Sequence, residues 1–511
     1  METDTSLIEP EDAVAAEPSV EMTADMCHAV GHDLQLQGKG AEAEAFYRAA
    51  LSLDPGRADS WANLGLAILK DGRPEESVQC QREALRLDPC NAEALNNLGI
   101  ALHGLNAMPE AENHFRGALR LVPGHCNAML NLGVIRQSLG HLEEAERLYR
   151  EARALGADEA RVCNNLALAL AELGRLEDAE TACREALIAH PDYPEASVNL
   201  GMILLMRGKM AEAWPYYEAR WRVPPLAGQA QLPEDKRWTG AEDIDGKTIL
   251  LLAEQGFGDT LQFCRYAPMI AKLGAKVVLA VPAPLAHLMG TLDGVDRVVS
   301  PEEVLPAFDL HCPLMSLPMA FGTTEETIPW RVPYLQADPD AVDRWLTVVP
   351  PANGLRVGLV WAGARRSGQP HAAAIDRRRS MAFTELAPLR AVPDCAFVSL
   401  QLGPPARQID QALLPMVDVT DRLTDFADTA ALIEALDLVI TVDTAAAHLA
   451  GALGKPVWLL NRFDSCWRWP RDRDDSEWYP TMRLFRQTAP GDWAGVIRRV
   501  AAALPRFQMF G

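Results

Sequence analysis

A 34-residue unit recurs through residues 25–222, and this period constrains the fold more than any other feature of the chain. Three ladders of residues keep one common register through the repeats. A shared register over six units predicts a helical solenoid, in which each unit buries its apolar face against the next. The first ladder is Asn63, Asn97, Asn131, Asn165 and Asn199; the second is Gly38, Gly72, Asn106, Gly140, Gly174 and Gly208; the third is Pro55, Pro89, Pro123, Ala157, Pro191 and Pro225.

One unit shows why each repeat is expected to hold two helices. Residues 59–69 follow a helical pattern that stops before Gly72, and residues 74–87 follow a second one. Asp88-Pro89 closes the unit, because proline cannot continue a helix. These units resemble the tetratricopeptide repeat over residues 25–222, because small residues and aromatic residues recur at the same positions of each unit as in that repeat. The resemblance implies six repeats that form a tetratricopeptide superhelix.

The asparagine ladder needs an explanation of its own. A carboxamide donates and accepts at once, so a row of them can pair with an extended peptide backbone whatever its side chains. The superhelix of O-GlcNAc transferases carries a similar ladder on its concave wall. We therefore expect Asn63, Asn97, Asn131, Asn165 and Asn199 to bind an acceptor polypeptide. The alternative is that each asparagine only bonds a neighbouring helix.

Composition and charge exclude several classes of function. The chain has 48 basic and 70 acidic residues, and no basic cluster predicts nucleic-acid binding. Its first 24 residues are acidic and lack the pattern of a secretory signal, so we expect a disordered tail. No apolar run is long enough to predict membrane insertion. Ten scattered cysteines without a Cys-x-x-Cys pair are typical of a cytoplasmic protein.

Beyond the repeats the pattern changes to short apolar runs that alternate with helical stretches, as in a parallel-sheet α/β protein. A proline-rich break divides this half, which predicts two Rossmann-like lobes in the GT-B arrangement. Expected strands are 248–253, 276–281, 356–361, 396–400, 437–442 and 456–460. The predicted organisation is a disordered acidic tail (1–24), six tetratricopeptide repeats (25–222), a linker (223–246), a GT-B N-terminal lobe (247–340) and a GT-B C-terminal lobe (354–505).

Ligands of such sheets bind beyond the carboxyl ends of the strands, so the residues after each strand matter most. Asp259 closes the sequence Gly256-Phe257-Gly258-Asp259 after the first strand. A carboxylate at this edge could accept the proton of an acceptor hydroxyl. It could equally serve only to cap the next helix. The spacing alone leaves both interpretations open.

A second turn of this kind follows residues 437–442. Asp443-Thr444-Ala445-Ala446-Ala447-His448 runs from a strand into a helix whose first turn has small side chains. Free backbone N–H groups and the helix dipole suit a phosphate there. Thr444 offers a hydroxyl, and His448 one turn later can donate to a phosphate or sugar oxygen. The alternative for His448 is a packing role.

The two turns together resemble the ADP-heptose:lipopolysaccharide heptosyltransferase family over about residues 245–500. Its members are inverting, metal-independent GT-B enzymes that use a nucleotide-sugar donor. The resemblance implies Asp259 as the catalytic base and Asp443, Thr444, Ala445 and His448 as donor-binding residues. The family usually has glycine where this chain has Ala445. Some tetratricopeptide glycosyltransferases of similar layout act on flagellin, which makes flagellin a candidate acceptor.

Two further segments carry possible site residues. Arg379 and Ser380 lie in the arginine-rich stretch 363–380 and resemble an Arg-Ser pair of a bacterial group that joins tetratricopeptide repeats to a glycosyltransferase-like half. The resemblance implies that they face the donor phosphates, unless this stretch is only a solvated basic loop. Trp458, Trp467, Trp469 and Trp478 could stack on a base or sugar, although such residues more often belong to the core. Asp472-Arg473-Asp474 imitates a metal-binding Asp-x-Asp, but no metal or other cofactor is expected.

The sequence therefore predicts a cytoplasmic protein glycosyltransferase whose repeats hold the acceptor polypeptide. Two alternatives stay open. One is a non-catalytic scaffold with a degenerate glycosyltransferase domain. The other is a transferase that acts on a glycan or on lipopolysaccharide.

Overall fold

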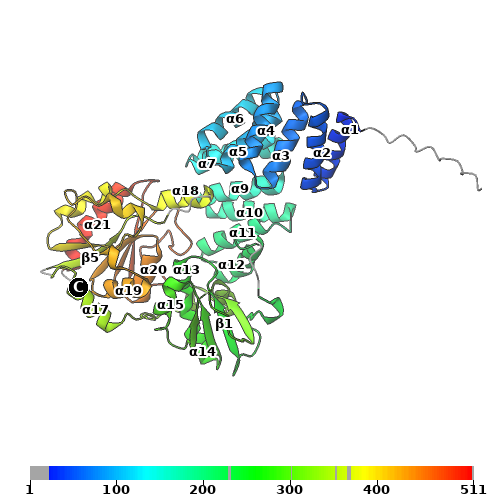
Figure 1. The fold of residues 1–511 in the computed structure, drawn as a ribbon. Coiled ribbons are helices and arrows are strands. Elements are labelled where there is room, and N and C mark those ends of the chain that lie inside the picture. Colours follow the sequence, from blue (N-terminus) through cyan, green and yellow to red (C-terminus); the bar gives the residue numbers. More distant parts are fainter. Residues whose placement is uncertain (1–21, 228–231, 301, 352–353, 365–369, 509–511) are drawn as a thin grey trace, which may run out of the picture. The chain divides into compact units, whose positions relative to one another are not determined.

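The computed structural model describes residues 22–227, 232–300, 302–351, 354–364 and 370–508 (Figure 1). The chain divides into two compact units, residues 1–135 and residues 136–511. Most of the predicted acidic tail and residues 228–231 of the predicted linker lie outside the described residues.

Helices occupy the whole repeat region and stack as antiparallel pairs (Figure 1). The repeat that ends at Asp88-Pro89 contains α3 and α4, whose bounds agree with the prediction to within one residue. The helices are α1 (Ala24–Leu36), α2 (Gly40–Leu53), α3 (Ala58–Lys70), α4 (Pro74–Leu87), α5 (Ala92–Gly104), α6 (Met108–Leu121), α7 (Cys126–Ser138), α8 (Leu142–Ala154), α9 (Glu159–Glu172), α10 (Leu176–Ala189), α11 (Pro194–Met206) and α12 (Met210–Tyr217), followed by the 3-10 helix η1 (Glu218–Arg222).

The second ladder of the sequence marks the turn inside each helix pair. All six of its members have a positive φ, between 60° and 84°. This left-handed conformation is free of strain only for glycine, and asparagine tolerates it better than other residues. The ladder therefore contains five glycines and one asparagine, Asn106, because the backbone reverses there between two helices.

Close packing within a pair explains the small residues of the first helices. A side chain at Gly99 would meet the Phe115 ring at 2.6 Å, and one at Gly31 would meet Tyr47 at 2.9 Å. Both rings are buried, with no more than 1% of their surface exposed. The aromatic residue of the second helix thus fills the space that the glycine of the first helix leaves open.

The first sheet of the α/β region has four parallel strands in the order β3-β2-β1-β4. Its core contains Leu250, Val278 and Val299. Its elements are β1 (Thr248–Leu252), α13 (Phe257–Phe263), α14 (Ala267–Lys272), β2 (Lys276–Ala280), α15 (Ala283–Met289), β3 (Arg297–Val299), β4 (Leu310–Pro313) and α16 (Leu317–Ala320), and α17 (Pro339–Leu346) leads to the second sheet.

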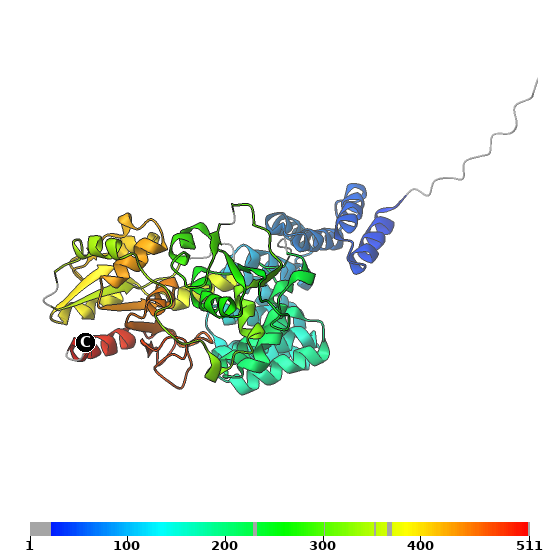
Figure 2. The same ribbon diagram turned by 90° about the horizontal axis from the view of Figure 1, so that it is seen from below.

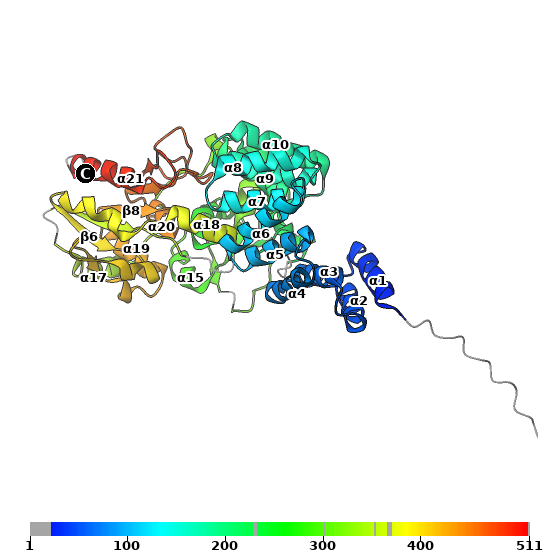
Figure 3. The same cartoon turned by 90° about the horizontal axis from the view of Figure 1, so that it is seen from above.

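The second sheet has six parallel strands in the order β10-β9-β8-β5-β6-β7. Helix α21 covers one face, where Trp493 and Val500 join the core around Val357, and α19 lies on the other face (Figures 2 and 3). Its elements are β5 (Leu355–Val360), α18 (Pro370–Arg379), β6 (Cys395–Ser399), β7 (Val417–Asp418), α19 (Phe426–Glu434), β8 (Leu438–Val442), α20 (Ala445–Ala452), β9 (Val457–Asn461), β10 (Met482–Arg486) and α21 (Trp493–Gln508).

The fold class is confirmed as a helical solenoid followed by an α/β region with parallel sheets. The six expected strands appear as β1, β2, β5, β6, β8 and β9. Four strands were not predicted, β3, β4, β7 and β10, which are either very short or interrupted by charged residues, histidine or proline. Such segments lack the continuous apolar run that marks a buried parallel strand.

Strand order fixes where ligands can bind. In both sheets the chain starts at a central strand, builds outward to one side and then returns to the other side. The two directions part between β1 and β4 in the first sheet, and between β5 and β8 in the second. Such a switch point opens a crevice at the carboxyl ends of its strands. The residues after these four strands therefore define the candidate site.

Candidate active site

Asp259 lies in the first turn of α13, directly beyond β1. Its Oδ2 accepts a hydrogen bond from the Gly256 N–H at 3.0 Å, which caps the helix. Its Oδ1 forms an ion pair with Arg468 Nη2 at 2.5 Å. The side chain keeps 24% of its surface exposed. Asp259 therefore caps α13 and also presents a carboxylate to solvent, so its role as a base stays a prediction.

Arg468 is a site residue that the sequence patterns did not reveal. Besides Asp259 it contacts Gln262 Oε1, and its guanidinium lies 4.3 Å from the centre of the Trp467 ring. The four tryptophans of this segment are at most 8% exposed, so the core interpretation of them is correct. No local pattern indicates that an arginine among core tryptophans would reach a carboxylate 209 positions away.

The turn after β8 leads into α20 as predicted. Thr444 precedes the helix in an extended conformation, and its hydroxyl lies 3.0 Å from that of Thr441. Asp443, Thr444 and Ala445 are all half-buried. The helix thus begins with a partly accessible first turn whose small side chains leave its backbone N–H groups approachable.

Arg379 ends α18 and Ser380 follows it, and the two side chains make different contacts. Arg379 Nη1 donates to the carbonyl of Asp443 at 3.1 Å, which places this guanidinium at the β8 turn. Ser380 Oγ accepts the Gly363 N–H at 3.1 Å and donates to the Asp376 carbonyl at 2.7 Å. Ser380 is thus hydrogen-bonded to the turn after β5. Donor binding by Ser380 stays a prediction, as it does for Arg379.

His448 lies in α20 and is only 5% exposed. Its Nδ1 lies 2.9 Å from the Tyr479 hydroxyl, and its ring is 5.5 Å from that of Trp469. Burial lowers the pKa of His448 to about 3, and the nearby Arg468 adds to this effect. The imidazole is therefore neutral at physiological pH, so any contact with a phosphate would be a neutral hydrogen bond rather than an ion pair.

The turns of the two sheets meet at Gly258. A side chain there would lie 2.8 Å from His448 Cδ2 and 3.7 Å from the Ala445 Cα. Only glycine allows α13 and α20 to approach this closely. The structure therefore brings Asp259, Ala445 and His448 from distant parts of the sequence into one neighbourhood.

A buried ion-pair network joins the end of the repeats to the switch point of the first sheet. Arg220 in η1 donates to Glu254 Oε1 at 3.0 Å and to Ser316 Oγ at 2.8 Å. Glu254 follows β1, and Ser316 follows β4. Arg220 also pairs with Glu218, whose carboxylate accepts the Ser316 hydroxyl. The last turn of the solenoid is therefore fixed to the carboxyl edge of the first sheet.

Glu254 is the most perturbed carboxyl group of this network. Burial raises its pKa to about 7, against the opposing effect of Arg220. The Met315 N–H donates to its Oε1 at 3.2 Å, while its Oε2 is buried without a hydrogen-bond partner among the described residues. Glu254 had no predicted role. Its position two residues after the end of β1 is the signal that could have identified it.

Two members of the asparagine ladder bond to a neighbouring repeat. Within residues 1–135, Asn131 Nδ2 donates to Asn96 Oδ1 at 2.9 Å. Within residues 136–511, Asn199 Nδ2 donates to Asn164 Oδ1 at 2.8 Å. These bonds join one repeat to the next and do not use the Oδ1 atoms of Asn131 and Asn199. Asn97 is 6% exposed, and the other four members are half-buried. Peptide binding by the ladder stays a prediction.

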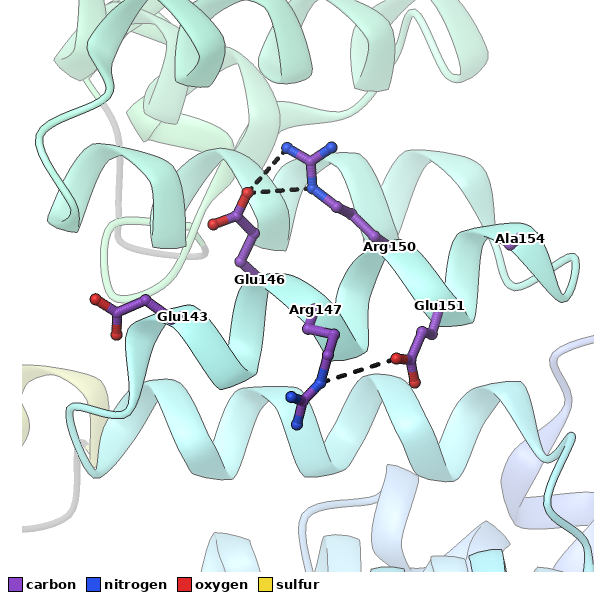
Figure 4. Close-up of a pocket in the computed structure, with 6 residues that line it drawn as sticks. All are labelled: Glu143, Glu146, Arg147, Arg150, Glu151 and Ala154. Atoms are coloured by element: carbon purple, nitrogen blue, oxygen red, sulfur yellow. Dashed lines mark hydrogen bonds and ion pairs between the residues drawn. The ribbon is translucent and has the colours of Figure 1, made fainter.

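A separate hollow of about 430 Å³ lies along α8, far in sequence from these turns (Figure 4). Its charged side chains pair with one another, Glu146 with Arg150 at 2.9 Å and Arg147 with Glu151 at 3.8 Å. Glu146 also pairs with Arg175 at 2.8 Å. These are ordinary surface ion pairs, and no orphan polar group among the described residues points to a ligand there.

One group in the described part of the chain has the composition of a metal site. Glu159, Cys163 and Glu185 bring their ligand atoms within 4.8 Å of one another. Arg153 pairs with both carboxylates and supplies the positive charge. Burial raises the pKa of the Cys163 thiol to about 12, which opposes formation of a metal-binding thiolate. These residues fit an ion-paired cluster better than a metal centre.

Comparisons with known proteins agree with this architecture. Models of the tetratricopeptide repeat match residues 31–89, 90–157, 130–194 and 184–222. The model of glycosyltransferase family 9 (heptosyltransferase) matches residues 406–460, which include the β8 turn but not Asp259. The chain therefore carries tetratricopeptide repeats followed by a glycosyltransferase-like region.

Protein FlbA of Caulobacter vibrioides is 31% identical over 327 residues, which cover 58% of this chain and 53% of FlbA. The chain thus spans about half the length of this curated relative. No helix among the described residues is both long and apolar enough to cross a membrane.

Solved structures similar to this chain include pilF of Pseudomonas aeruginosa, 21% identical, with a TM-score of 0.34. It matches over 40% of this chain and 93% of pilF. A tetratricopeptide protein of Thermus thermophilus is 22% identical, with a TM-score of 0.33, over 36% of this chain and 99% of its own. Similarity this weak supports no statement about function.

Proposed function

We propose that this protein is an inverting, metal-independent glycosyltransferase that moves a sugar from a nucleotide-sugar onto a polypeptide held by its repeats. The observation that carries the proposal is the buried network of Arg220, Glu254 and Ser316. It fixes the end of the solenoid at the switch point of the first sheet. A polypeptide bound along the last repeats would therefore be delivered to the edge that contains Asp259.

The second sheet supplies the donor side of this proposal. The amides that begin α20, the Thr444 hydroxyl and the Arg379 guanidinium surround the turn after β8. They would hold the phosphates of the nucleotide-sugar, with Asp443, Ala445 and Ser380 shaping the two turns. His448 would add a neutral hydrogen bond to a phosphate or sugar oxygen.

The reaction follows from these positions. The acceptor hydroxyl oxygen attacks the anomeric carbon, and its proton passes to the Asp259 carboxylate. The bond between that carbon and the leaving phosphate oxygen breaks, and its electron pair leaves with the nucleotide. Arg379 and the α20 amides stabilise the charge that develops there. A single displacement inverts the anomeric configuration.

The carboxamides of the asparagine ladder would bind the acceptor backbone whatever its side chains. The ladder consists of Asn63, Asn97, Asn131, Asn165 and Asn199. Flagellin is the first acceptor to test, because transferases of similar layout act on it. All ten cysteines are free thiols, which supports a cytoplasmic location.

The experiment is intact-mass spectrometry of acceptor proteins from the native host carrying the wild type or Asp259→Asn. A protein that carries a fixed sugar mass only with the wild type supports the proposal. If every candidate acceptor protein has the same mass in both strains, the non-catalytic scaffold is favoured. Loss of the sugar from lipopolysaccharide instead of protein favours the glycan transferase.

A further inference from the structure

Four arginines gather beyond the carboxyl ends of β9 and β10, outside the residues assigned to the donor. We call Arg378, Arg462, Arg471 and Arg486 the arginine cluster. Arg378 comes from the end of α18, Arg462 directly follows β9, and Arg486 ends β10. Arg471 lies in the loop between these two strands. The cluster thus collects four cations at one edge of the sheet.

Few carboxylates balance this charge. Asp464 lies 3.0 Å from Arg378 Nε and 3.5 Å from Arg462 Nη1. Glu172 of α9 lies 3.0 Å from Arg378 Nη1. A third acid near the cluster, Asp472, is exposed to solvent. Among the described residues, two carboxylates that are at most 15% exposed therefore face four guanidinium groups.

The other two arginines bond only to backbone carbonyls among the described residues. Arg471 Nη2 donates to the Ala171 carbonyl at 3.3 Å, and Arg486 Nη2 donates to the Pro470 carbonyl. A carbonyl accepts a hydrogen bond but does not neutralise a charge. Burial lowers the pKa of Arg471, and it lowers the pKa of Arg486 to about 10. By contrast, the pKa of buried Arg220 is raised, because its carboxylate partners outweigh its burial.

The cluster also contains N–H groups without an acceptor. Arg462 Nε, Arg471 Nε and Arg486 Nη1 are buried and have no hydrogen-bond partner among the residues that the structure describes. The Arg462 side chain is nine-tenths buried. Leaving charged donors unpaired in this way is costly, and the usual explanation is a bound water or ion. Forked guanidinium donors match the oxygens of a phosphate best.

The cluster lies at the same sheet edge as the candidate donor turn. Arg378 and Arg379 are neighbours in sequence but reach different places, Arg379 to the Asp443 carbonyl and Arg378 to Asp464. Neighbouring parallel strands lie about 4.8 Å apart, so the ends of β8 and β9 are adjacent. An anion bound in the cluster would therefore stand beside the amides that begin α20.

We propose that the arginine cluster is a second oxyanion site, which takes a phosphate group. That this phosphate belongs to the nucleotide-sugar rests on the proposed function; the alternative source is free inorganic pyrophosphate. In either case Arg462, Arg471 and Arg486 supply the unpaired donors. Asp464 links Arg378 to Arg462, and the Ala171 carbonyl of α9 holds Arg471.

The test is calorimetric titration of the full chain with inorganic pyrophosphate, and then with ADP, UDP and GDP. Arg462→Met and Arg486→Met keep most of the side-chain length and remove the charge. Arg483→Met is the matched control, because Arg483 lies on β10 with 52% of its side chain exposed. We expect a loss of pyrophosphate affinity of about ten-fold or more in the two cluster variants, the effect of one charge-assisted hydrogen bond, and almost none in the control.

Stability without ligand gives an independent readout. If the arginines of the cluster stay unpaired until an anion binds, the melting temperatures of the two methionine variants should be no lower than that of the wild type. Pyrophosphate should then raise the melting temperature of the wild type only. A large drop in the melting temperature of both variants would show that the protein already pairs these arginines, and would overturn the proposal. Absence of pyrophosphate binding by the wild type at millimolar concentration would overturn it too.

The titrations with ADP, UDP and GDP, compared with the titration with pyrophosphate, test this inference separately from the proposed function. Nucleoside diphosphates that bind more tightly than pyrophosphate and lose affinity in the same variants identify the donor as the source. Variants that lose only pyrophosphate binding identify free pyrophosphate. Pyrophosphate binding that depends on the cluster, in a protein that transfers no sugar, supports the site and contradicts the function. Sugar transfer with unchanged binding in both variants contradicts the site alone.

Discussion

The carboxyl edges of the two sheets differ in how their charges are satisfied. At the first sheet Glu254 and Asp259 are both paired, with Arg220 and Arg468. At the second sheet the arginine cluster has more cations than buried carboxylates, and several of its N–H groups lack an acceptor among the described residues. The difference therefore lies in the charge balance of the two edges and not in unpaired atoms, because Arg220 Nε and Glu254 Oε2 at the first edge also lack a hydrogen-bond partner among the described residues.

Under the proposed function, this difference suits the two edges to different partners. An edge whose charges are satisfied can hold a neutral hydroxyl and position one carboxylate as a base. An edge with excess cationic donors is stabilised most by a bound phosphate, because the phosphate oxygens accept hydrogen bonds from donors that are otherwise unpaired at a cost in free energy. The asymmetry therefore agrees with an acceptor on the first sheet and a nucleotide-sugar on the second.

The largest expected effect is on catalysis at the first edge. Asp259→Asn removes the proposed base and should lower the rate of sugar transfer by about 10²- to 10⁴-fold, without weakening nucleotide binding. The measurement is the rate of acceptor mass increase at saturating donor. Asp338→Asn, which alters a carboxylate cap at α17, is the matched control. A normal rate in Asp259→Asn would remove Asp259 from the reaction.

Removing a cation should have unequal effects on stability at the two edges. Arg220→Met leaves buried Glu254 without its partner and should destabilise the first sheet by about 3–5 kcal/mol. Arg486→Met removes a cation that no carboxylate among the described residues pairs, and should not destabilise the second sheet. Hydrogen exchange of the β1 and β9 amides measures each effect locally. Equal losses in the two variants would erase the contrast between the edges.

The contact between the two turns can be broken by one methyl group. Gly258→Ala places a Cβ about 2.8 Å from His448 Cδ2, and overpacking of this kind costs about 1–3 kcal/mol. Gly124→Ala is the control, because nothing in the described part of the chain lies within 4 Å of its new methyl group. Limited proteolysis should cut Gly258→Ala faster between the sheets, around residues 321–340. Equal cleavage of both variants would show that this contact does not hold α13 against α20.

The two edges should respond to pH with opposite sign. The pKa of Glu254 is raised from 4.5 to about 7, so its contribution to stability is present below pH 4.5 and is lost as the pH rises through 7. The pKa of His448 is lowered from 6.5 to about 3, so its contribution is present above pH 6.5 and is lost as the pH falls toward 3.

Variants of each residue isolate these contributions. Between pH 5 and 7 the stability of Glu254→Gln should rise relative to the wild type, and that of His448→Asn should fall relative to the wild type. The expected slope is at most about 1.4 kcal/mol per pH unit. Urea denaturation at a series of pH values measures both slopes. Slopes of the same sign would contradict the assignment of opposite pKa shifts.

The smallest effect is expected at the hollow of α8. Arg147→Ala breaks an exposed ion pair with Glu151, and such pairs on a helix contribute about 0.3–0.5 kcal/mol. Thermal unfolding should therefore barely change, and pyrophosphate binding should stay as in the wild type. A pronounced loss of pyrophosphate binding would show that an exposed arginine contributes as much as the buried arginines of the cluster. A pronounced loss of thermal stability would show that this exposed ion pair contributes more than such pairs usually do.

Local features were predictable from the sequence to a large extent. The 34-residue register placed the helices of the repeats, since each turn needs a residue that accepts a positive φ. Continuous apolar runs identified six strands, and the rule that ligands bind after strands pointed to Asp259 and to the β8 turn. The short strands β3 and β7 were missed because two or three residues do not form a recognisable pattern.

The pairing of charges was decided only by the tertiary structure. Arg468 reaches Asp259 across 209 positions, and Arg220 reaches Glu254 only because the end of the solenoid contacts the first sheet. Periodicity, turn conformation and strand hydrophobicity depend on neighbouring residues, so the sequence determined the solenoid and the α/β region. Ion pairs depend on which distant surfaces meet, so only the folded chain shows that charges are paired at one sheet edge and that cations outnumber buried carboxylates at the other.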